Sequence, residues 1–371
     1  MTYGGKQMVI QKIPFFDVST TNDPVLTQKC VSNVCSRNWY ILGEEVSNFE
    51  AEFAAYNGTC HSVAVANGTD ALTLALKAVG VRQSDKVVLV ANAGFYGSTA
   101  VHSVGAEPLY IDVSQTSRNM DPSELAKTLE STSVSAVVVT HLYGQAADIE
   151  AIVAVCDKHN VPLIEDCAQA HGAIVNERKV GSFGTVGCFS FYPTKNLGAL
   201  GDGGAVITNQ ESVAQSLREL RQYGWDKKYR VAISCGQNSR LDEIQAAILR
   251  KKLTLLDGWN EERRQIARAY TAALAKHVET PTITESCVAH LYVIQSDQRD
   301  LLKEHLVSTG IATDIHYPIP DHQQPAYGDD IVLPNTEYLA RTCLSLPCYP
   351  GMPQQHVDRV IEHVCEFFKT L

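Results

Sequence analysis

Short apolar runs alternate with helix-forming segments between Cys60 and about Asn209, and this alternation most constrains the fold. Continuous apolar strands separated by helices are typical of a parallel sheet that helices cover on both faces. We therefore expect an α/β fold with a mainly parallel sheet. Four runs rich in β-branched residues are the predicted strands: Lys86–Asn92, Glu107–Val113, Ser135–His141 and Val161–Asp166.

Helix signals lie between these strands and after them. Asp121 and Pro122 fit the N-cap and the first position of a helix, and residues 147–160 carry apolar residues at helical spacing. From about Asp242 a long helical stretch leaves the alternating region, and a smaller α+β segment follows it. We expect a large domain over residues 1–241, including the N-terminal segment, and a connecting helix with a smaller C-terminal domain over residues 242–371.

Composition narrows the class of protein. The 371 residues carry a formal net charge of −10, which argues against broad binding to nucleic acid or to an anionic membrane. The 11 cysteines are scattered without a CxxC pair, as in reduced cytoplasmic proteins. No apolar stretch reaches the ~20 residues that span a bilayer, and the start of the chain lacks a signal-peptide segment. We expect a cytoplasmic protein without a metal and without a nucleic-acid or membrane partner.

Lys195 lies in the stretch FSFYPTKNLGALGDGGAV, after two aromatic residues and a proline and before a glycine-rich turn. A surface charge is the usual role of a single lysine. The stretch has few charges, however, and a buried lysine costs free energy unless it is paired or neutral. The glycines would let a ligand approach the backbone closely. This context favours a lysine that is held in place for chemistry.

A turn that leads into a helix, VANGTDALTLALKAV, is a candidate phosphate site. Gly68, Thr69 and Asp70 would offer backbone N–H groups at the helix N-terminus, and Thr69 also a hydroxyl. An ordinary capped helix is the alternative. The turn matches neither GxGxxG nor GxxxxGK[ST], which counts against dinucleotide and nucleoside-triphosphate binding.

Other candidates also follow predicted strands, where open parallel sheets bind ligands. Phe95 could stack on a flat ring, although a core aromatic is the commoner role. Asp166 ends an apolar strand and needs a cationic partner or several donors, with a helix cap as the alternative. Gln169 and His171 lie just beyond it and could be structural. Together these features fit a ligand with a phosphate, an aromatic ring, a ring nitrogen that takes a proton, and an aldehyde. Pyridoxal 5'-phosphate has all four groups.

At this point the chain resembles the DegT/DnrJ/EryC1/StrS family of sugar aminotransferases, pyridoxal-phosphate enzymes of the aspartate-aminotransferase fold (fold type I). The resemblance runs from about Trp39 to LSLPCYPGM near the end of the chain. It rests on a linked set of motifs: NGTDAL, HLYGQAAD, EDCAQAHGA, SFYPTKNLGALGDGGAV and GQNSRLDEIQAAIL.

The resemblance implies a role for each candidate. Lys195 would attach to the cofactor aldehyde and then shuttle protons, which needs a tuned pKa. Asp166 would keep the pyridine nitrogen protonated, and Phe95 would stack on the ring. Gln169 would contact the ring-hydroxyl side. The phosphate would be held by Gly68, Thr69 and Ser190, with Asp70 in the same turn.

The resemblance also implies a homodimer with shared active sites. In this family the Asn of a GxNxR motif reaches the phosphate across the interface, and that residue is Asn238 here.

The substrate is implied by the branch that the chain resembles most. Most members carry histidine in SFHxxK, whereas this chain has Tyr192, and with His316 and Tyr317 it looks like the dTDP-3-oxo-6-deoxyhexose branch. We expect L-glutamate to donate its amino group to such a nucleotide-linked keto sugar, giving a 3-amino-3,6-dideoxyhexose, with these three residues as substrate contacts. A 4-oxo-sugar aminotransferase is the main alternative. A non-catalytic cofactor-binding regulator should have lost Lys195 or Asp166, and a nicotinamide dehydrogenase does not fit the phosphate turn.

Overall fold

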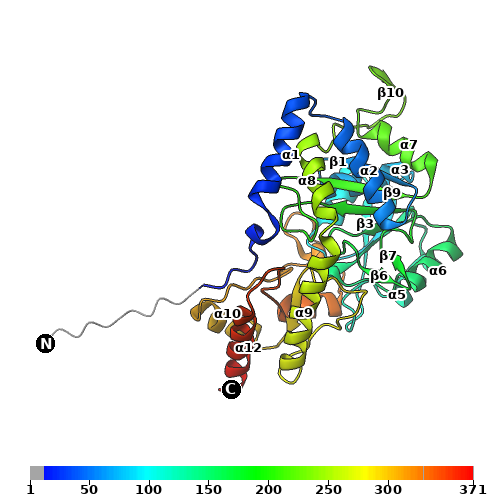
Figure 1. Cartoon of the computed structure of the whole chain (residues 1–371). Helices are drawn as coiled ribbons and strands as arrows, with labels where there is room; N and C mark the ends of the chain where they lie inside the picture. Colours follow the sequence, from blue (N-terminus) through cyan, green and yellow to red (C-terminus); the bar gives the residue numbers. More distant parts are fainter. Residues whose placement is uncertain (1–11, 329, 371) are drawn as a thin grey trace.

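The computed structural model describes residues 12–328 and 330–370 (Figure 1). The first eleven residues of the predicted large domain, together with residues 329 and 371, lie outside the described part of the chain.

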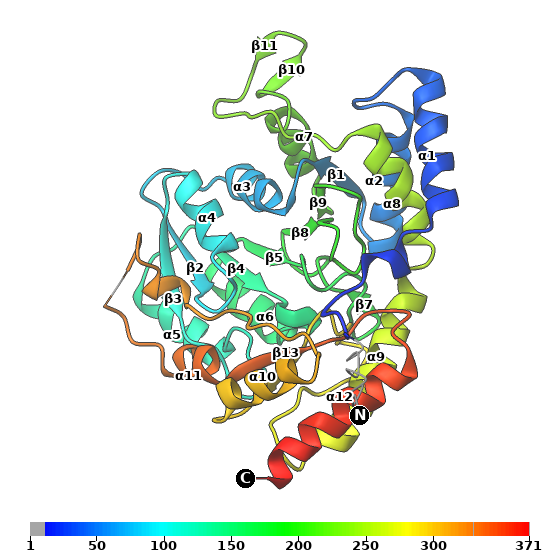
Figure 2. The ribbon, with the colours of Figure 1, turned by 90° about the vertical axis from the view of Figure 1, so that its left-hand side faces the viewer.

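A seven-stranded sheet forms the centre of the large part, in the order β1-β9-β8-β5-β4-β2-β3 (Figure 2). Strands β2, β3, β4, β5 and β8 are parallel, and β9 runs antiparallel to β8 and β1. The predicted mainly parallel sheet is confirmed, and each predicted run contains one observed strand. The strands are β1 (His61–Val65), β2 (Lys86–Val90), β3 (Glu107–Ile111), β4 (Ala136–Thr140), β5 (Leu163–Asp166), β8 (Val186–Ser190) and β9 (Gly204–Thr208).

Helices cover both faces of the sheet (Figure 2). Side chains alternate along β2, so Val87 and Leu89 pack in the core beneath α3, α4 and α7, whereas Val88 and Val90 pack beneath α5 and α6. Helices α2 and α8 cover the β8–β9 side of that second face. The helices are α2 (Glu44–Asn57), α3 (Gly68–Ala78), α4 (Tyr96–Ser103), α5 (Pro122–Ser131), α6 (Ile149–His159), α7 (Glu211–Leu220) and α8 (Glu243–Leu253).

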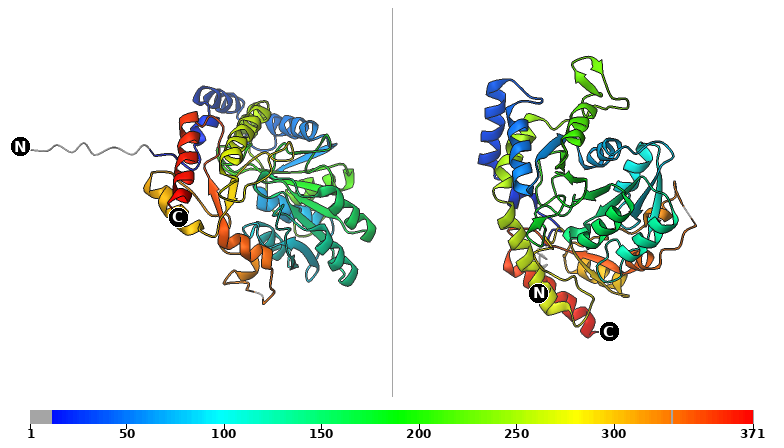
Figure 3. Two further views of the ribbon diagram at one scale, coloured as in Figure 1. Left: turned by 90° about the horizontal axis from the view of Figure 1, so that it is seen from below. Right: turned by 90° about the vertical axis from the view of Figure 1, so that its right-hand side faces the viewer.

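A smaller α+β part follows α8, and Figure 3 shows it beside the large part. Its two strands pair antiparallel, and α9, α10 and α12 pack around a second apolar core. The elements of this part are α9 (Leu256–Leu274), β12 (Tyr292–Gln295), α10 (Arg299–Ser308), α11 (Pro334–Thr342), β13 (Cys343–Leu346) and α12 (Gln354–Lys369).

The N-terminal segment differs from the predicted division. Ile13 pairs with Ile311 in a parallel bridge, and Ile13 and Phe16 pack in the core of the small part. Ile13 and Phe16 thus contact the small part, through partners far along the sequence, and the predicted division of the chain stays a prediction. Helix α1 (Pro24–Arg37) packs against α8 instead. The boundary near residue 242 stays a prediction, with α8 in the large core and α9 in the small one.

Short elements complete the described chain: η1 (Val18–Thr21), η2 (Leu142–Gly144), β6 (Ile174–Val175), β7 (Arg178–Lys179), β10 (Trp225–Lys227), β11 (Arg230–Val231) and η3 (Asp321–Gln323). None of the helices in the described ranges is both long enough and apolar enough to cross a bilayer.

Candidate active site

A cavity of about 640 Å³ opens where the large and small parts meet. Thr140, Asp166 and Ser190 end β4, β5 and β8, so the cavity lies at the carboxyl ends of the parallel strands, the usual ligand position in such sheets. The sequence-predicted residues that line the cavity are Gly68, Thr69, Asp166, Gln169, Ser190, Tyr192, Lys195, His316 and Tyr317.

The start of α3 forms one end of the cavity. The Asn67 side chain caps the helix by accepting a hydrogen bond from the Asp70 N–H at 2.8 Å. A Cβ atom on residue 68 would lie 2.6 Å from the Ser190 Cβ, so glycine is needed for this close approach. Gly68, Thr69 and Ser190 therefore surround one small space. Asp70 does not line the cavity, and its N–H is used by the Asn67 cap.

Asp166 is buried at the end of β5. Its Oδ1 accepts the Ala168 N–H at 3.1 Å, and its Oδ2 accepts the Thr140 hydroxyl at 3.4 Å. Burial raises the pKa of this carboxyl, while the Ala168 N–H and the Lys195 ammonium oppose the rise. Two donors leave acceptor capacity for a further proton donor in the cavity.

Glu165, the preceding residue, points to the other face of the strand and is fully satisfied. Its carboxylate accepts the N–H groups of Gly181, Phe183 and Gly184 at 2.6–2.8 Å. His141 Nδ1 accepts a backbone N–H, so Nε2 carries the proton and donates to Glu165 at 3.0 Å. This carboxylate therefore anchors the loop after β7 and has no capacity left for a ligand.

Lys195 follows a turn in which its N–H donates to the Tyr192 carbonyl at 2.8 Å. Its Nζ forms no hydrogen bond or ion pair with any residue of the described ranges. Burial lowers the pKa of Lys195 to about 8, and the Asp166 carboxylate opposes the fall. An amine with this pKa can be neutral near physiological pH, as nucleophilic and proton-transfer roles require.

Gln169 links the two parts of the protein across the cavity. Its Oε1 accepts the Tyr143 N–H at 2.6 Å, and its Nε2 donates to the Tyr317 hydroxyl at 2.9 Å. The Tyr317 ring fits against Gly94, where a Cβ would lie 2.8 Å from the ring. His316 is held by a 2.9 Å hydrogen bond between its Nδ1 and the Ser345 hydroxyl.

Tyr192 is half exposed at the cavity, with 53% of its surface accessible. Phe15, which sequence reasoning did not select, stacks on His316 with ring centroids 5.7 Å apart. It lines the cavity from the N-terminal segment.

Phe95 does not line the cavity, which differs from the expected stacking position. It has left-handed backbone (φ 68°) at the N-cap of α4, and its ring stacks on Tyr327 at 5.1 Å. The neighbouring Tyr96 lines the cavity instead. The Phe95 N–H and the Ser98 hydroxyl donate to Asp321, which fixes this segment of the small part against α4.

Asn238 also lies outside the cavity of its own chain. It is exposed and bridges to Gln222, beyond the hairpin of β10 and β11 that projects from the large part (Figure 2). Nearby Arg240 forms no hydrogen bond or ion pair with other described residues. The expected contact of Asn238 with a second subunit stays a prediction.

Other cavity residues were missed because single polar or aromatic residues carry little sequence signal. Besides Tyr96 and Phe15, they include Asn67, Thr140, Asp202, His290 and Asp314. The adjacent aromatics in NAGFYG were the available signal for Tyr96. His171, weighed as a candidate, is buried behind the cavity wall, and burial lowers its pKa to about 3.

Comparisons with known proteins agree with this geometry. The model of the DegT/DnrJ/EryC1/StrS aminotransferase family matches residues 24–365. The dTDP-3-amino-3,4,6-trideoxy-alpha-D-glucose transaminase of Micromonospora megalomicea is 42% identical over 92% of this chain and 94% of its own. The dTDP-3-amino-3,6-dideoxy-alpha-D-galactopyranose transaminase of Aneurinibacillus thermoaerophilus is 42% identical over 95% and 98%. The crystal structure of S. venezuelae DesV in complex with a ketimine intermediate superposes with a TM-score of 0.92, at 39% identity over 96% and 98%.

The lowered pKa of Lys195 predicts a pH-dependent stability of the cofactor-free chain. The pKa is about 8 in the folded protein against an ordinary 10.5, so the folded state binds fewer protons between these values. Stability should then rise with pH across that window. Lys195→Met should be more stable than wild type at pH 7 by about 1–3 kcal/mol, with a gain that shrinks toward pH 10.

Urea unfolding of the cofactor-free full chain at pH 7, 8.5 and 10 measures this difference. Exposed Lys276→Met is the matched control and should show no pH-dependent gain. If Lys195→Met raised the free energy of unfolding by the same amount at all three pH values, the lowered pKa of Lys195 would be rejected.

Proposed function

The chain belongs to the DegT/DnrJ/EryC1/StrS aminotransferase family, and from that premise we propose that it transfers the amino group of L-glutamate to carbon 3 of a dTDP-linked 3-oxo-6-deoxyhexose. It is a transaminase of fold type I, and its cofactor is pyridoxal 5'-phosphate. The observation that carries the position of transfer is that both relatives at 42% identity are named as transaminases of dTDP-linked 3-amino sugars.

The cavity residues fit the cofactor at each of its functional groups. Gly68, Thr69 and Ser190 offer donors for the phosphate in the space that residue 68 leaves free of a Cβ. Asp166 has acceptor capacity for a protonated ring nitrogen, and Lys195 has an Nζ for the aldehyde carbon that no described residue engages. When bound, the cofactor supplies an electron sink for the bond changes at the amino carbon.

Lys195 performs the proton transfers in the proposed reaction. Its Nζ, with a pKa of about 8, takes the proton from Cα of glutamate and later delivers a proton to carbon 3 of the sugar. Asp166 keeps the proton on the ring nitrogen. We assign ring stacking to Tyr96, because Phe95 is turned toward Tyr327.

A homodimer would complete the site. Among the described residues that line the cavity, Lys195 is the only lysine or arginine, whereas glutamate and a nucleotide-linked sugar both carry negative charge. Asn238 and Arg240, which has no partner among the described residues, lie outside their own cavity and could serve that of a second copy. We therefore propose two shared sites per dimer.

Product analysis tests the position of transfer. With glutamate as donor, dTDP-3-oxo-6-deoxyhexose should give the 3-amino sugar, identified by mass spectrometry and NMR. The 3-oxo sugar should be aminated at least about tenfold faster than the 4-oxo isomer, because the loss of one well-placed contact typically lowers the rate by that factor. Preferential amination of the 4-oxo sugar would replace the proposal with a 4-aminotransferase.

Mixed dimers test the shared site. Asn238→Ala should weaken cofactor binding, and Lys195→Ala should abolish turnover. If Asn238 serves the partner's phosphate, heterodimers carry both lesions in one site and neither in the other, so activity should return to about half of the wild-type level per heterodimer. Demonstrated subunit exchange without recovery would argue for a site contained in one chain.

Tyr192→Phe separates sugar binding from packing. If the Tyr192 hydroxyl contacts the sugar nucleotide, kcat/KM for the keto sugar should fall about tenfold, the usual effect of one lost hydrogen bond. The half-reaction with glutamate should be nearly unchanged, because it needs no nucleotide. Equal losses in both half-reactions, or a lowered Tm, would indicate a packing role.

A further inference from the structure

We propose that His290 is a positioning residue for Lys195: a neutral imidazole whose bare Nε2 accepts a hydrogen bond from the Lys195 ammonium when the bound cofactor has released that side chain. The proposal deepens the proposed function and rests on Lys195 as its proton carrier. His290 lines the same cavity as Lys195 and precedes β12 in the small part.

A chain of buried amides fixes the tautomer of His290. The Asn260 Nδ2 donates to the His171 carbonyl at 2.8 Å, so its Oδ1 is the atom that faces Asn196. The Asn196 Nδ2 donates to that Oδ1 at 2.8 Å and to the Val288 carbonyl at 3.1 Å. Because backbone carbonyls only accept, both amides have one orientation, and the Asn196 Oδ1 lies 2.9 Å from His290 Nδ1. Nδ1 must therefore carry the proton, and Nε2 is bare.

The surroundings of His290 keep the ring neutral. Burial, followed by the charges of Lys195 and Arg263 and then by His171 and His316, holds its pKa well below the ordinary value. No carboxylate of the described chain forms an ion pair with it. The ring therefore remains an acceptor at Nε2 across the working pH range.

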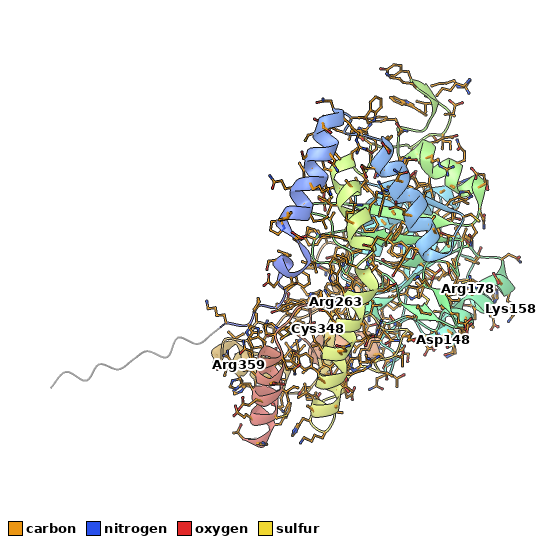
Figure 4. All side chains as sticks on the ribbon, in the orientation of Figure 1. Asp148, Lys158, Arg178, Arg263, Cys348 and Arg359 are labelled. Atoms are coloured by element: carbon orange, nitrogen blue, oxygen red, sulfur yellow. The ribbon has the colours of Figure 1, made fainter. Side chains whose placement is uncertain are left out.

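Arg263, behind the cavity wall, supplies part of the positive charge that keeps His290 neutral. It is 1% exposed, lies beside Cys348 (Figure 4) and has no carboxylate within ion-pair distance among the described residues. Its Nη1 donates to the carbonyls of His290 at 3.2 Å and Cys348 at 2.6 Å. The same guanidinium thus fixes the backbone of His290 and disfavours protonation of its ring.

Lys195 needs such an acceptor once it is released from the cofactor. Asp166 is then engaged by the ring nitrogen, and the Gln169 Oε1 already accepts a backbone N–H. Asp202 also lines the cavity, but its side chain is exposed to solvent. His290 Nε2 has no partner among the described residues, and Asn196, which holds the ring, directly follows Lys195.

A neutral acceptor also suits a lysine that must lose its proton again. A carboxylate at this place would raise the pKa of Lys195 and hold the proton, whereas an imidazole lone pair orients the ammonium with a smaller effect on its pKa. His290 would therefore place Lys195 Nζ between proton transfers without preventing them.

A matched pair of variants tests this role. In His290→Asn the side-chain amide can still donate to Asn196 from the place of Nδ1, but the Nε2 acceptor is gone. In His290→Gln the longer amide can place an acceptor near the place of Nε2. Both are compared with wild type as full-length protein loaded with pyridoxamine 5'-phosphate, in which Lys195 is free.

Trace labelling with acetic anhydride, quantified on the Lys195 peptide by mass spectrometry, reports the neutral fraction of the amine. Loss of the acceptor should make labelling at pH 7 about three- to tenfold faster in His290→Asn, because the ammonium loses a hydrogen bond. His290→Gln should stay close to wild type. Unchanged labelling in His290→Asn, with or without a lowered Tm, would overturn the positioning role.

Two further measurements distinguish failure of the His290 role from failure of the proposed function. Borohydride reduction of the pyridoxal-phosphate form, followed by peptide mapping, should place the cofactor on Lys195; attachment to another lysine would overturn the proposed function rather than the role of His290 alone. Nitrogen-15 NMR of histidine-labelled wild type should show His290 with a bare Nε2 from pH 6 to 9, assigned by its loss in His290→Gln. A protonated Nε2 would overturn the proposal even if His290→Asn failed to fold.

Discussion

Two buried ionisable groups of opposite sign, Asp166 and Lys195, share one cavity, and most of the site is arranged around this pair. Each group alone would strongly favour its neutral form in such surroundings. Together each moderates the pKa shift of the other, so that the carboxyl can remain a proton acceptor while the amine stays near its titration point. The strand ends and the turn at Tyr192 place the two groups on the same side of the sheet.

The adjacent carboxylates of β5 show how strand geometry separates structural from chemical roles. Glu165 and Asp166 are neighbours in sequence but point to opposite faces of the strand. Glu165 meets three backbone N–H groups and His141, so its charge is used to hold a loop. Asp166 meets only two donors and keeps acceptor capacity on the cavity side. The distribution of donors, more than burial, decides which carboxylate can act on a ligand.

The sheet, the capped helix after Asp121 and part of the cavity, including Gly68, Asp166 and Lys195, could be predicted, because each depends on a local pattern at a strand end or a helix start. The structure differs from the sequence-based expectations where distant segments decide the outcome. Two aromatics are adjacent in NAGFYG, and the one that faces the cavity is set by backbone geometry at Phe95 and by Tyr327, far along the chain. The place of Ile13 depends on Ile311. His290 carries no motif, and its partner Asn196 lies 94 residues away.

The segment that runs from His316 to Tyr327 joins the two parts at several points. Tyr317 bonds to Gln169, and Asp321 accepts from Phe95 and Ser98 while its own N–H donates to the Ala91 carbonyl. Large hinge opening would break all of these contacts at once. These contacts oppose such opening, so the substrate meets a site whose walls are already in place. Its residence time is then set by the contacts it makes there, and selection for new sugars can act by exchanging single wall residues without retuning a domain motion.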